Sequence, residues 1–415
     1  MNLNSYHYSD NTLYCEQVAL ADIARRAGTP CFVYSQAEIL GRFNAYKAGF
    51  GETPHEICYA VKANSNLSIL RLLAEAGAGF DIVSGGELFR VLKAGGDPSK
   101  VVFSGVGKTA QEIDYAITSG IHSFNCESPD EMRLIDSIGA RLGKKVRVAF
   151  RVNPDIDART HPYISTGLKK NKFGIDIRQA PRLYGEALEH KNLLVEGVSC
   201  HIGSQILETE PIVEAADRVL ELVEGLRKAG VPVQYLDLGG GLGVSYQASE
   251  PAPDITATVR RMVEHTAGRN LTLHIEPGRS IVGPAGVLVT RVLYRKHTEQ
   301  KEFVVVDAAM TELIRPALYN AHHDIIPLRS ADNRGTFVAD VVGPVCETGD
   351  FLAHDRKLPQ VMPGDLLAVC TAGAYGFAQS SNYNSRPRPA EVLVNGAQWT
   401  TVRIRETYDD LIRGE

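Results

Sequence analysis

Short β-type runs and longer stretches with helical spacing alternate along residues 31–280 of the chain. The eight runs predicted to be strands are Ile57–Val61, Gly79–Val83, Val101–Ser104, His122–Cys126, Val146–Val152, Val195–His201, Tyr235–Leu238 and Leu273–Glu276. Eight alternating strand–helix units in about 250 residues predict a (β/α)8 TIM-like barrel. An open parallel sheet is the alternative, because the same alternation is compatible with both folds.

The clearest predicted helix spans residues 211–228. It begins with Pro211, a residue favoured in the first turn, and repeats apolar residues from Ile212 to Leu226 at helical spacing. Gly230 follows directly after its end, as expected for a helix terminus.

The pattern changes near residue 280, where turn residues begin to separate β-rich runs and long helical stretches stop. These runs are Gly286–Tyr294, Phe303–Val306, Thr336–Val342, Leu366–Cys370, Glu391–Val394 and Thr400–Ile404. They predict a second, antiparallel β-domain formed by residues 281–415. Thr12–Tyr14 and Cys31–Tyr34 are also strand-like, so we expect residues 1–30 to join this domain and residues 31–280 to form the barrel. A chain of 415 residues is long enough for two domains.

Composition and charge narrow the class of protein. Hydrophobic residues make up 44% of the chain, and charged residues 22%, as in ordinary globular proteins. The net charge of −5 and the pI near 6.2 argue against a general binder of nucleic acid or anionic membranes. The seven cysteines include no CxxC pair, and an odd number excludes a fully paired disulfide framework. The first ten residues lack the features of a secretory signal, so we expect a cytoplasmic protein.

Lys62, in the run YAVKAN at 59–64, is the first candidate for chemistry. Functional groups of a βα barrel gather at the carboxyl ends of its strands, and Lys62 follows the first predicted strand. At the end of a buried strand, desolvation would lower the pKa of the lysine and make it a nucleophile toward an aldehyde. The alternative is an ordinary surface lysine.

Other polar groups and glycines stand at the ends of later predicted strands. They are Asp81, the pair His201 and Ser204, the loop Gly239–Gly243, and the pair Glu276 and Arg279. Taken singly, the glycines could form a simple turn, His201 could be a core histidine, and Glu276 could pair with Arg279.

One cofactor gives all these groups a role. Pyridoxal 5'-phosphate (PLP) needs a lysine for its Schiff base, a phosphate cup, a group stacked on its ring and a partner for its ring nitrogen. Glycine-rich backbone after an apolar strand suits the phosphate. A carboxylate such as Glu276 would keep the ring nitrogen protonated, which favours reactions such as decarboxylation that leave negative charge on the α-carbon.

The chain resembles the PLP-dependent decarboxylases of the alanine-racemase-like fold (fold type III) over essentially its whole length. The shared parts are YAVKAN, HIGS at 201–204, GGGLG at 239–243, EPGR at 276–279, GPVCETGD at 343–350 and the turn Ala374-Tyr375-Gly376. Three further stretches resemble the diaminopimelate branch of this family: HPYISTGLKKNKFGI at 161–175, RPALYNAHHDI at 315–325 and SNYNSRPRP at 381–389. The resemblance implies decarboxylation of meso-2,6-diaminopimelate to L-lysine and carbon dioxide, the last step of lysine biosynthesis.

The resemblance also implies roles for individual residues. Lys62, Cys346 and His201 would be catalytic, with Cys346 as the acid that reprotonates the α-carbon. The cofactor would contact Lys62, Asp81, His201, Ser204, Gly240, Gly241, Glu276, Gly278, Arg279 and Tyr375. The distal end of the substrate would contact Arg279, Arg315, Tyr319, Glu347 and Tyr375. Members of the family are homodimers with sites at the interface, so Cys346 and Glu347 would reach the cofactor of the other chain. No metal is implied.

Arg315 and Tyr319 favour a substrate with a carboxylate at its far end, because arginine binds a carboxylate through two hydrogen bonds. A surface ion pair is the alternative for Arg315, and a simple buried cysteine is the alternative for Cys346. At the level of function, the alternatives are a decarboxylase of ornithine, arginine or lysine, a racemase, and a non-catalytic relative. Residues 161–175 could form a lid over the site.

Overall fold

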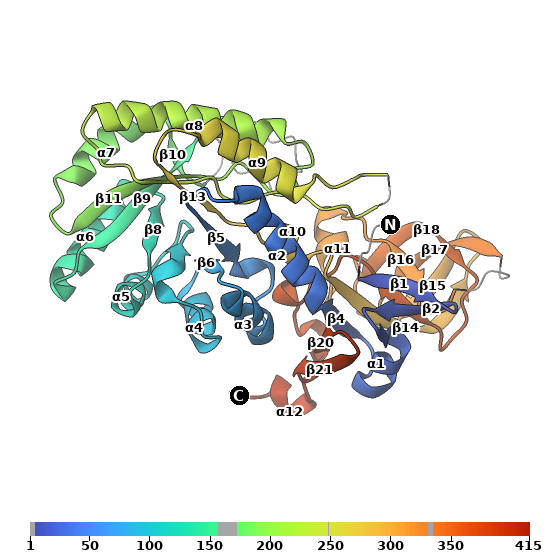
Figure 1. Ribbon diagram of the computed structural model, residues 1–415. Coiled ribbons are helices and arrows are strands. Elements are labelled where there is room, and N and C mark those ends of the chain that lie inside the picture. The colour runs from blue at the N-terminus through green and yellow to red at the C-terminus, as the bar shows by residue number, and fades with distance from the viewer. Residues whose placement is uncertain (1–4, 157–171, 248, 331–334) are drawn as a thin grey trace. The chain divides into compact units, whose positions relative to one another are not determined.

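The computed structural model describes residues 5–156, 172–247, 249–330 and 335–415. The chain forms two compact units (Figure 1). One comprises residues 42–243 and 252–280, and the other comprises residues 1–41, 244–251 and 281–415. The stretch 161–175, for which a lid was expected, lies mostly outside the described residues, and only its last four residues are described.

The first unit is a closed barrel of eight parallel strands. In spatial order the strands are β5 (His55–Ala60), β6 (Gly79–Ile82), β7 (Val101–Phe103), β8 (Ser123–Cys126), β9 (Val146–Asn153), β11 (Leu193–Cys200), β12 (Tyr235–Asp237) and β13 (Thr272–Ile275). The pairings β8–β9 and β13–β5 complete the ring, and the short β10 (Ile175–Asp176) adds to β9. The prediction of a barrel is confirmed, and the open sheet is excluded because both of its edges would have to be unpaired.

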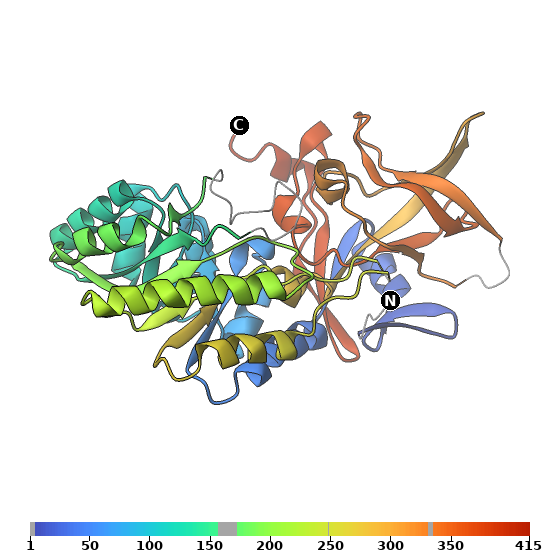
Figure 2. The ribbon, with the colours of Figure 1, turned by 90° about the horizontal axis from the view of Figure 1, so that it is seen from above.

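Helices cover the outside of the barrel and alternate with its strands (Figures 1 and 2). They are α2 (Gln36–Phe50), α3 (Leu67–Glu75), α4 (Gly85–Lys93), α5 (Ala110–Ser119), α6 (Pro129–Leu142), α7 (Ala180–Leu188), α8 (Glu210–Lys228) and α9 (Ile255–Thr266). Single 3-10 turns lie at Val61–Ala63 and Pro98–Lys100. Helix α8 confirms the prediction for residues 211–228. It has Pro211 in its first turn and a buried apolar face that includes Val219 and Leu226.

The second unit is built around the long strand β14 (Gly286–His297). The sheet order is β18 (Phe351–Pro359), β17 (Thr336–Val342), β15 (Glu302–Val306), β14, β4 (Cys31–Ser35), β20 (Ala390–Asn395) and β21 (Gln398–Arg403). β16 (Ile325–Pro327) pairs with β19 (Leu366–Val369), which pairs with β14. β1 (Tyr6–Ser9), β2 (Thr12–Cys15) and β3 (Val18–Ala19) form a small separate sheet. Most pairs are antiparallel, and the exceptions are β15–β17 and β20–β4.

Short helices complete the second unit: α1 (Leu20–Ala27), α10 (Arg279–Val282, at the boundary of the two units), α11 (Arg315–Tyr319) and α12 (Tyr408–Leu411), with 3-10 turns at Phe377–Gln379 and Tyr383–Ser385. Its core includes side chains of β1, β4, β14 and β20. Within the described ranges, no helix has both the length and the hydropathy needed to cross a membrane.

Candidate active site

Lys62 lies in the 3-10 turn directly after β5, at the carboxyl end of the barrel. Its ammonium is 3.2 Å from Oδ2 of Asp81, a buried residue in the neighbouring strand β6. The other oxygen of Asp81, Oδ1, is buried and makes no hydrogen bond with any described residue. The structure thus brings together the predicted lysine and the predicted carboxylate.

The expectation that Lys62 is desolvated is wrong. The strand ends at Ala60, so the chain has already turned before Lys62 and leaves 40% of its side chain exposed.

Glu276 follows β13 and belongs to a buried network at the same end of the barrel. The Asn125 amide donates to Oε1 of Glu276 at 3.3 Å and to Oδ2 of Asp237 at 3.0 Å. The Ser104 hydroxyl also donates to Glu276 at 3.3 Å, and the N–H of Gly239 donates to Asp237 at 2.8 Å. Asp237 is fully buried, and Glu276 is only 8% exposed.

Electrostatics assign the protons within this network. Burial raises the pKa of Glu276 well above its usual value, and the nearby charges of Asp237 and Asp81 raise it further. Burial also raises the pKa of Asp237, although hydrogen bonds from Glu276 and Gly239 oppose that effect. Because two buried carboxylates in contact cannot both ionise easily, we infer that they share one proton, held by Glu276 and directed at Asp237. A carboxylic acid held in this way can share its proton with an aromatic ring nitrogen.

His201, directly after β11, is a neutral imidazole. Its Nδ1 accepts a hydrogen bond of 3.2 Å from the N–H of Gly240, so any proton on the neutral ring is on Nε2. Burial lowers the pKa of His201 well below 6.5, and the positive charges of Arg151 and Lys62 lower it further. An uncharged flat ring at this position is suited to stacking on an aromatic cofactor.

The glycine loop after β12 fits so closely that side chains have no room. A Cβ on Gly239 would lie 2.5 Å from the carbonyl oxygen of Cys200, and one on Gly240 would lie 2.1 Å from that of Glu276. On Gly241, at φ +108°, it would lie 2.3 Å from the carbonyl oxygen of Gly203. Bare backbone of this kind can approach a phosphate group closely.

Ser204, Gly278 and Arg279 border the same edge of the barrel. Nη2 of Arg279 donates to the Ser204 hydroxyl at 2.9 Å, and Arg279 is only 6% exposed. A Cβ on Gly278 would lie 3.0 Å from Cβ of Ala63, so this glycine lets its segment pack against the turn that holds Lys62. The barrel edge therefore provides an amine, a buried acid, a neutral ring and glycine backbone without side chains, and these groups fit PLP.

The remaining predicted residues lie in the second unit. Arg315 begins α11 and is buried, which excludes the alternative of a surface ion pair. Its Nη1 lies 2.8 Å from Nε2 of His323, and its guanidinium lies over the Tyr246 ring at 4.5 Å. Nδ1 of His323 lies 2.8 Å from the Cys370 carbonyl oxygen and must donate to it, so Nε2 is left to accept from Arg315. Tyr319 ends the same helix and is half-buried.

Cys346 and Glu347 lie in an irregular turn between β17 and β18. Cys346 is exposed, and its N–H donates to Oδ1 of Asn384 at 2.8 Å. The Tyr383 hydroxyl donates to Glu347 at 3.2 Å, and the Glu347 carboxylate raises the pKa of Tyr383. Tyr375 has a φ of +55°, a strained conformation for a residue with a side chain and one that is concentrated at functional sites.

Sequence reasoning missed several residues of the barrel edge and of the surroundings of Arg315. They are Asn125, Asp237, Glu87, Tyr246 and His323. A usable signal existed for the first two, because both are polar residues within apolar barrel strands. Glu87, in α4, is a third ionisable group near Lys62 and Asp81: burial raises its pKa to about 7, the N–H of Val83 opposes this, and Asp81 adds to it.

Comparisons with known proteins identify the family of this chain. Residues 36–283 match the family model of the pyridoxal-dependent decarboxylase, pyridoxal binding domain. The diaminopimelate decarboxylase of Pseudomonas aeruginosa is 55% identical over 413 residues, which cover 100% of this chain and 99% of the relative.

Two solved structures are similar over nearly their full length. The diaminopimelate decarboxylase of Helicobacter pylori complexed with L-lysine has a TM-score of 0.91 and 43% identity, and covers 95% of this chain and 98% of that one. The enzyme of M. jannaschii in co-complex with L-lysine has a TM-score of 0.94 and 38% identity, with 99% and 97% covered. The chain therefore belongs to the diaminopimelate decarboxylase family of pyridoxal-dependent decarboxylases.

Proposed function

We propose that the protein converts meso-2,6-diaminopimelate into L-lysine and carbon dioxide, the last step of lysine biosynthesis, with PLP as its cofactor. The observation that supports this most directly is the buried Glu276–Asp237 pair beside the Lys62–Asp81 pair. A buried acid that can share a proton with the ring nitrogen, close to the amine that would hold the cofactor, is suited to a reaction in which an α-carbon loses carbon dioxide.

The residues of the barrel edge would hold the cofactor. Lys62 would bind its aldehyde carbon, Glu276 its ring nitrogen, and His201 the face of its ring. The loop Gly239–Gly241, Ser204, Gly278, Arg279 and Tyr375 would surround its phosphate. The cofactor supplies an electron sink for the negative charge left on the α-carbon after carbon dioxide departs.

Side chains of the protein would hold and donate the protons needed for decarboxylation. Asp81 keeps the Lys62 amine within 3.2 Å of a buried carboxylate, which fixes its position and can take up charge when the amine changes state. Asp237, through Asn125 and its contact with Glu276, would keep a proton available at the ring nitrogen. Cys346 would give the proton of its thiol to the α-carbon.

Selection of the substrate would depend on the distal carboxylate. Arg315 and Tyr319 would bind it, and Glu347 would pair with the neighbouring ammonium. The planar guanidinium of Arg315, fixed by His323 and Tyr246, can present parallel N–H donors to a carboxylate. An ornithine, arginine or lysine decarboxylase needs no such clamp, which makes that alternative less well supported.

We also propose that the enzyme is a cytoplasmic homodimer in which Cys346 and Glu347 complete the site of the partner chain. All seven cysteines are free thiols, which suits a reducing compartment. Mixing and re-associating the inactive variants Lys62→Ala and Cys346→Ala should then restore activity, because one site of each mixed dimer has both residues. No recovery, despite exchange of subunits, would exclude sharing of the site.

The experiment that tests the function is product analysis by mass spectrometry after PLP-loaded protein is incubated with meso-diaminopimelate. We expect lysine and carbon dioxide in equal amounts, and none with Lys62→Ala. Absence of lysine from a protein that binds PLP would reject the proposed reaction.

A further inference from the structure

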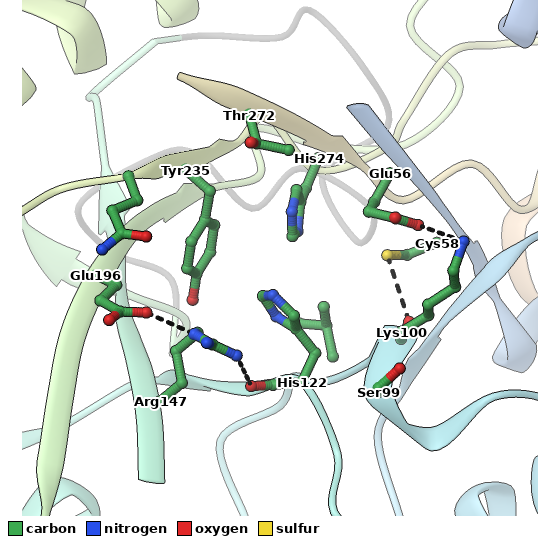
Figure 3. A pocket seen from close by; sticks show the side chains of 12 residues that line it. Glu56, Cys58, Ser99, Lys100, His122, Arg147, Glu196, Tyr235, Thr272 and His274 are labelled. Atoms are coloured by element: carbon green, nitrogen blue, oxygen red, sulfur yellow. Dashed lines mark hydrogen bonds and ion pairs between the residues drawn. The ribbon is translucent and has the colours of Figure 1, made fainter. Parts of the chain in front are cut away.

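A second polar cavity lies at the amino ends of the barrel strands, at the opposite end of those strands from Lys62 (Figure 3). Its volume is about 210 Å³, and it contains no residue of the candidate active site. An apolar cavity of about 150 Å³ is enough to hold a benzene molecule, so this space can hold a small ligand.

Three rings converge in this cavity: His122, Tyr235 and His274 (Figure 3). The ring centroids of His274 lie 4.7 Å from Tyr235 and 5.1 Å from His122, and those of His122 and Tyr235 are 5.3 Å apart. Gly197 in the neighbouring strand leaves room for the tyrosine ring to pack closely, because a Cβ there would lie 2.1 Å from it. The rings therefore form a preorganised cluster.

Two polar atoms of this cluster lack partners although they are buried. Nδ1 of His274 and the Tyr235 hydroxyl make no hydrogen bond with any described residue, and these residues are only 2% and 4% exposed. The Ser123 hydroxyl, which lowers the pKa of Tyr235, lies 3.0 Å from Nδ1 of His122. Buried polar atoms without partners are costly, so they indicate a bound molecule.

The charged groups of the cavity already neutralise one another. Arg147 is 2.6 Å from Glu196, and Lys100 is 3.4 Å from Glu56 (Figure 3). Both carboxylates are thus paired, and the unpaired groups at the centre are imidazole and phenol rings that can donate. Among the described residues, no group of three or more His, Cys, Asp or Glu side chains is arranged to hold a metal ion.

The two histidines can supply the charge that an anion needs. Burial lowers the pKa of His274 to about 3 and that of His122 to about 4, and positive charge on Arg147 contributes to both shifts. Both rings are neutral at pH 7, but an anion placed between them would stabilise a protonated imidazole and so raise its pKa. The titratable and charged groups around the two rings are Glu56, Cys58, Lys100, Arg147, Glu196 and Tyr235.

We propose that this cavity is a binding site for a small oxyanion, a sulfate, phosphate or carboxylate group, which enters together with a proton taken up by the His122–His274 pair. The anion and the proton that enters with it are together close to neutral, so their binding avoids the cost of burying an isolated charge. The Tyr235 hydroxyl and the imidazole N–H groups donate to the oxyanion. This site does not depend on the decarboxylase reaction.

The test is isothermal titration calorimetry of the PLP-loaded protein with sodium sulfate, at constant ionic strength and at pH 6, 7 and 8. Sulfate does not titrate in this range, and bound PLP occupies the phosphate cradle of the active site. Buffers of different ionisation enthalpy report the number of protons taken up. A parallel titration with acetate distinguishes a tetrahedral oxyanion from a carboxylate as the preferred ligand.

We expect millimolar binding that weakens as the pH rises, by up to about tenfold per pH unit, with uptake of about one proton. His274→Gln should abolish the binding. The control is His265→Gln, at a half-buried histidine on α9 that pairs with Asp217 of α8, and it should leave the binding unchanged. Binding without proton uptake, binding that His274→Gln retains, or no binding of either anion to the wild-type protein would each overturn the proposal. The proton count comes from the wild-type protein, so it stands even if the variant fails to fold.

Discussion

The carboxyl groups of Asp237 and Glu276 accept hydrogen bonds from one and the same amide, that of Asn125, at 3.0 and 3.3 Å. The amide fixes the two buried carboxyl groups side by side. Two acids so arranged hold one proton more firmly than either would alone. The acid proposed for the ring nitrogen is therefore a pair rather than a single glutamate.

Replacing Glu276 by Gln should reduce decarboxylation by about 10²- to 10³-fold, because the amide cannot keep the ring nitrogen charged. The variant should also change the pH dependence of stability. The pKa of Glu276 is higher in the folded protein than its usual value, so the wild-type protein without cofactor should lose stability as the pH rises above about 4.5 toward that raised pKa.

Melting temperatures of the cofactor-free proteins between pH 6 and 9 measure this effect, and Glu276→Gln should give the flatter profile. Glu264→Gln, at an exposed position on α9, is the control and should match the wild type. Activity of Glu276→Gln within tenfold of the wild type would contradict the role assigned to the pair.

The Lys62–Asp81 pair predicts a second result. Lys62→Met should lower the stability of the cofactor-free protein by about 1–2 kcal/mol, because it leaves the buried Asp81 carboxylate without its cation. The double variant Lys62→Met/Asp81→Asn should recover most of this loss. Calorimetric melting of the four proteins in the cycle measures the coupling, and a double variant whose loss of stability equals the sum of the two single losses would show that the pair has no energetic coupling.

Gly240→Ala should weaken PLP binding by more than about 100-fold, since the new methyl group would displace the segment that follows Glu276. The matched control is Gly185→Ala in helix α7, where a Cβ meets nothing within 4 Å. That change should leave PLP binding intact and stabilise the protein by about 0.5–1 kcal/mol. Spectroscopic titration with PLP tests both expectations, and equal affinities would show that the loop is not the phosphate cradle.

The histidines of the second cavity predict acid sensitivity. The pKa values of His122 and His274 in the folded protein are about 4 and about 3, below the usual 6.5, so the unfolded chain binds more protons between these values. Stability from this source is present above pH 6.5 and is lost as the pH falls. At pH 4, His274→Gln should recover about 3 kcal/mol relative to its effect at pH 7.5. Denaturant unfolding of both proteins in chloride buffers without oxyanions measures this effect. The same difference in unfolding free energy between variant and wild type at pH 4 and at pH 7.5 would refute the prediction.

Arg315→Lys should raise KM for meso-diaminopimelate by about 10- to 100-fold and change kcat much less. Lysine keeps the charge, but it cannot lie flat over the Tyr246 ring and still present two parallel donors. Steady-state kinetics separate the two constants. An unchanged KM would mean that the guanidinium does not bind the distal carboxylate.

Much of the architecture could be predicted from local pattern. Apolar runs located all eight barrel strands to within two residues at each end, because buried parallel strands are nearly continuous in their hydrophobicity. β18 was missed because it lies at the edge of its sheet, where the charged run His354–Lys357 is mostly solvated and masks the strand pattern.

The site was harder to predict where it depends on residues distant in sequence. Asn125 and Asp237 are 112 residues apart in the chain, and each is an isolated polar residue in an apolar run until the barrel closes. The exposure of Lys62 was mispredicted because of a local feature, the end of strand β5, rather than residues distant in sequence. A shift of one residue in the strand end can decide whether a side chain is buried, and strand ends are the least certain feature of a sequence pattern.

The central claim is that a decarboxylase site on this barrel selects its substrate by a distal carboxylate. The proposed product, L-lysine, keeps the distal carboxylate and has lost the reacting one. D-Lysine is meso-diaminopimelate without the distal carboxylate, so these two compounds differ only in what the clamp would recognise. The most direct measurement is the ratio of kcat/KM for decarboxylation of meso-diaminopimelate and of D-lysine by the same PLP-loaded preparation. The account predicts a ratio of about 10⁴ or more, as for a site built to hydrogen-bond a group that the analogue lacks. Comparable values, with cadaverine formed from D-lysine, would contradict it.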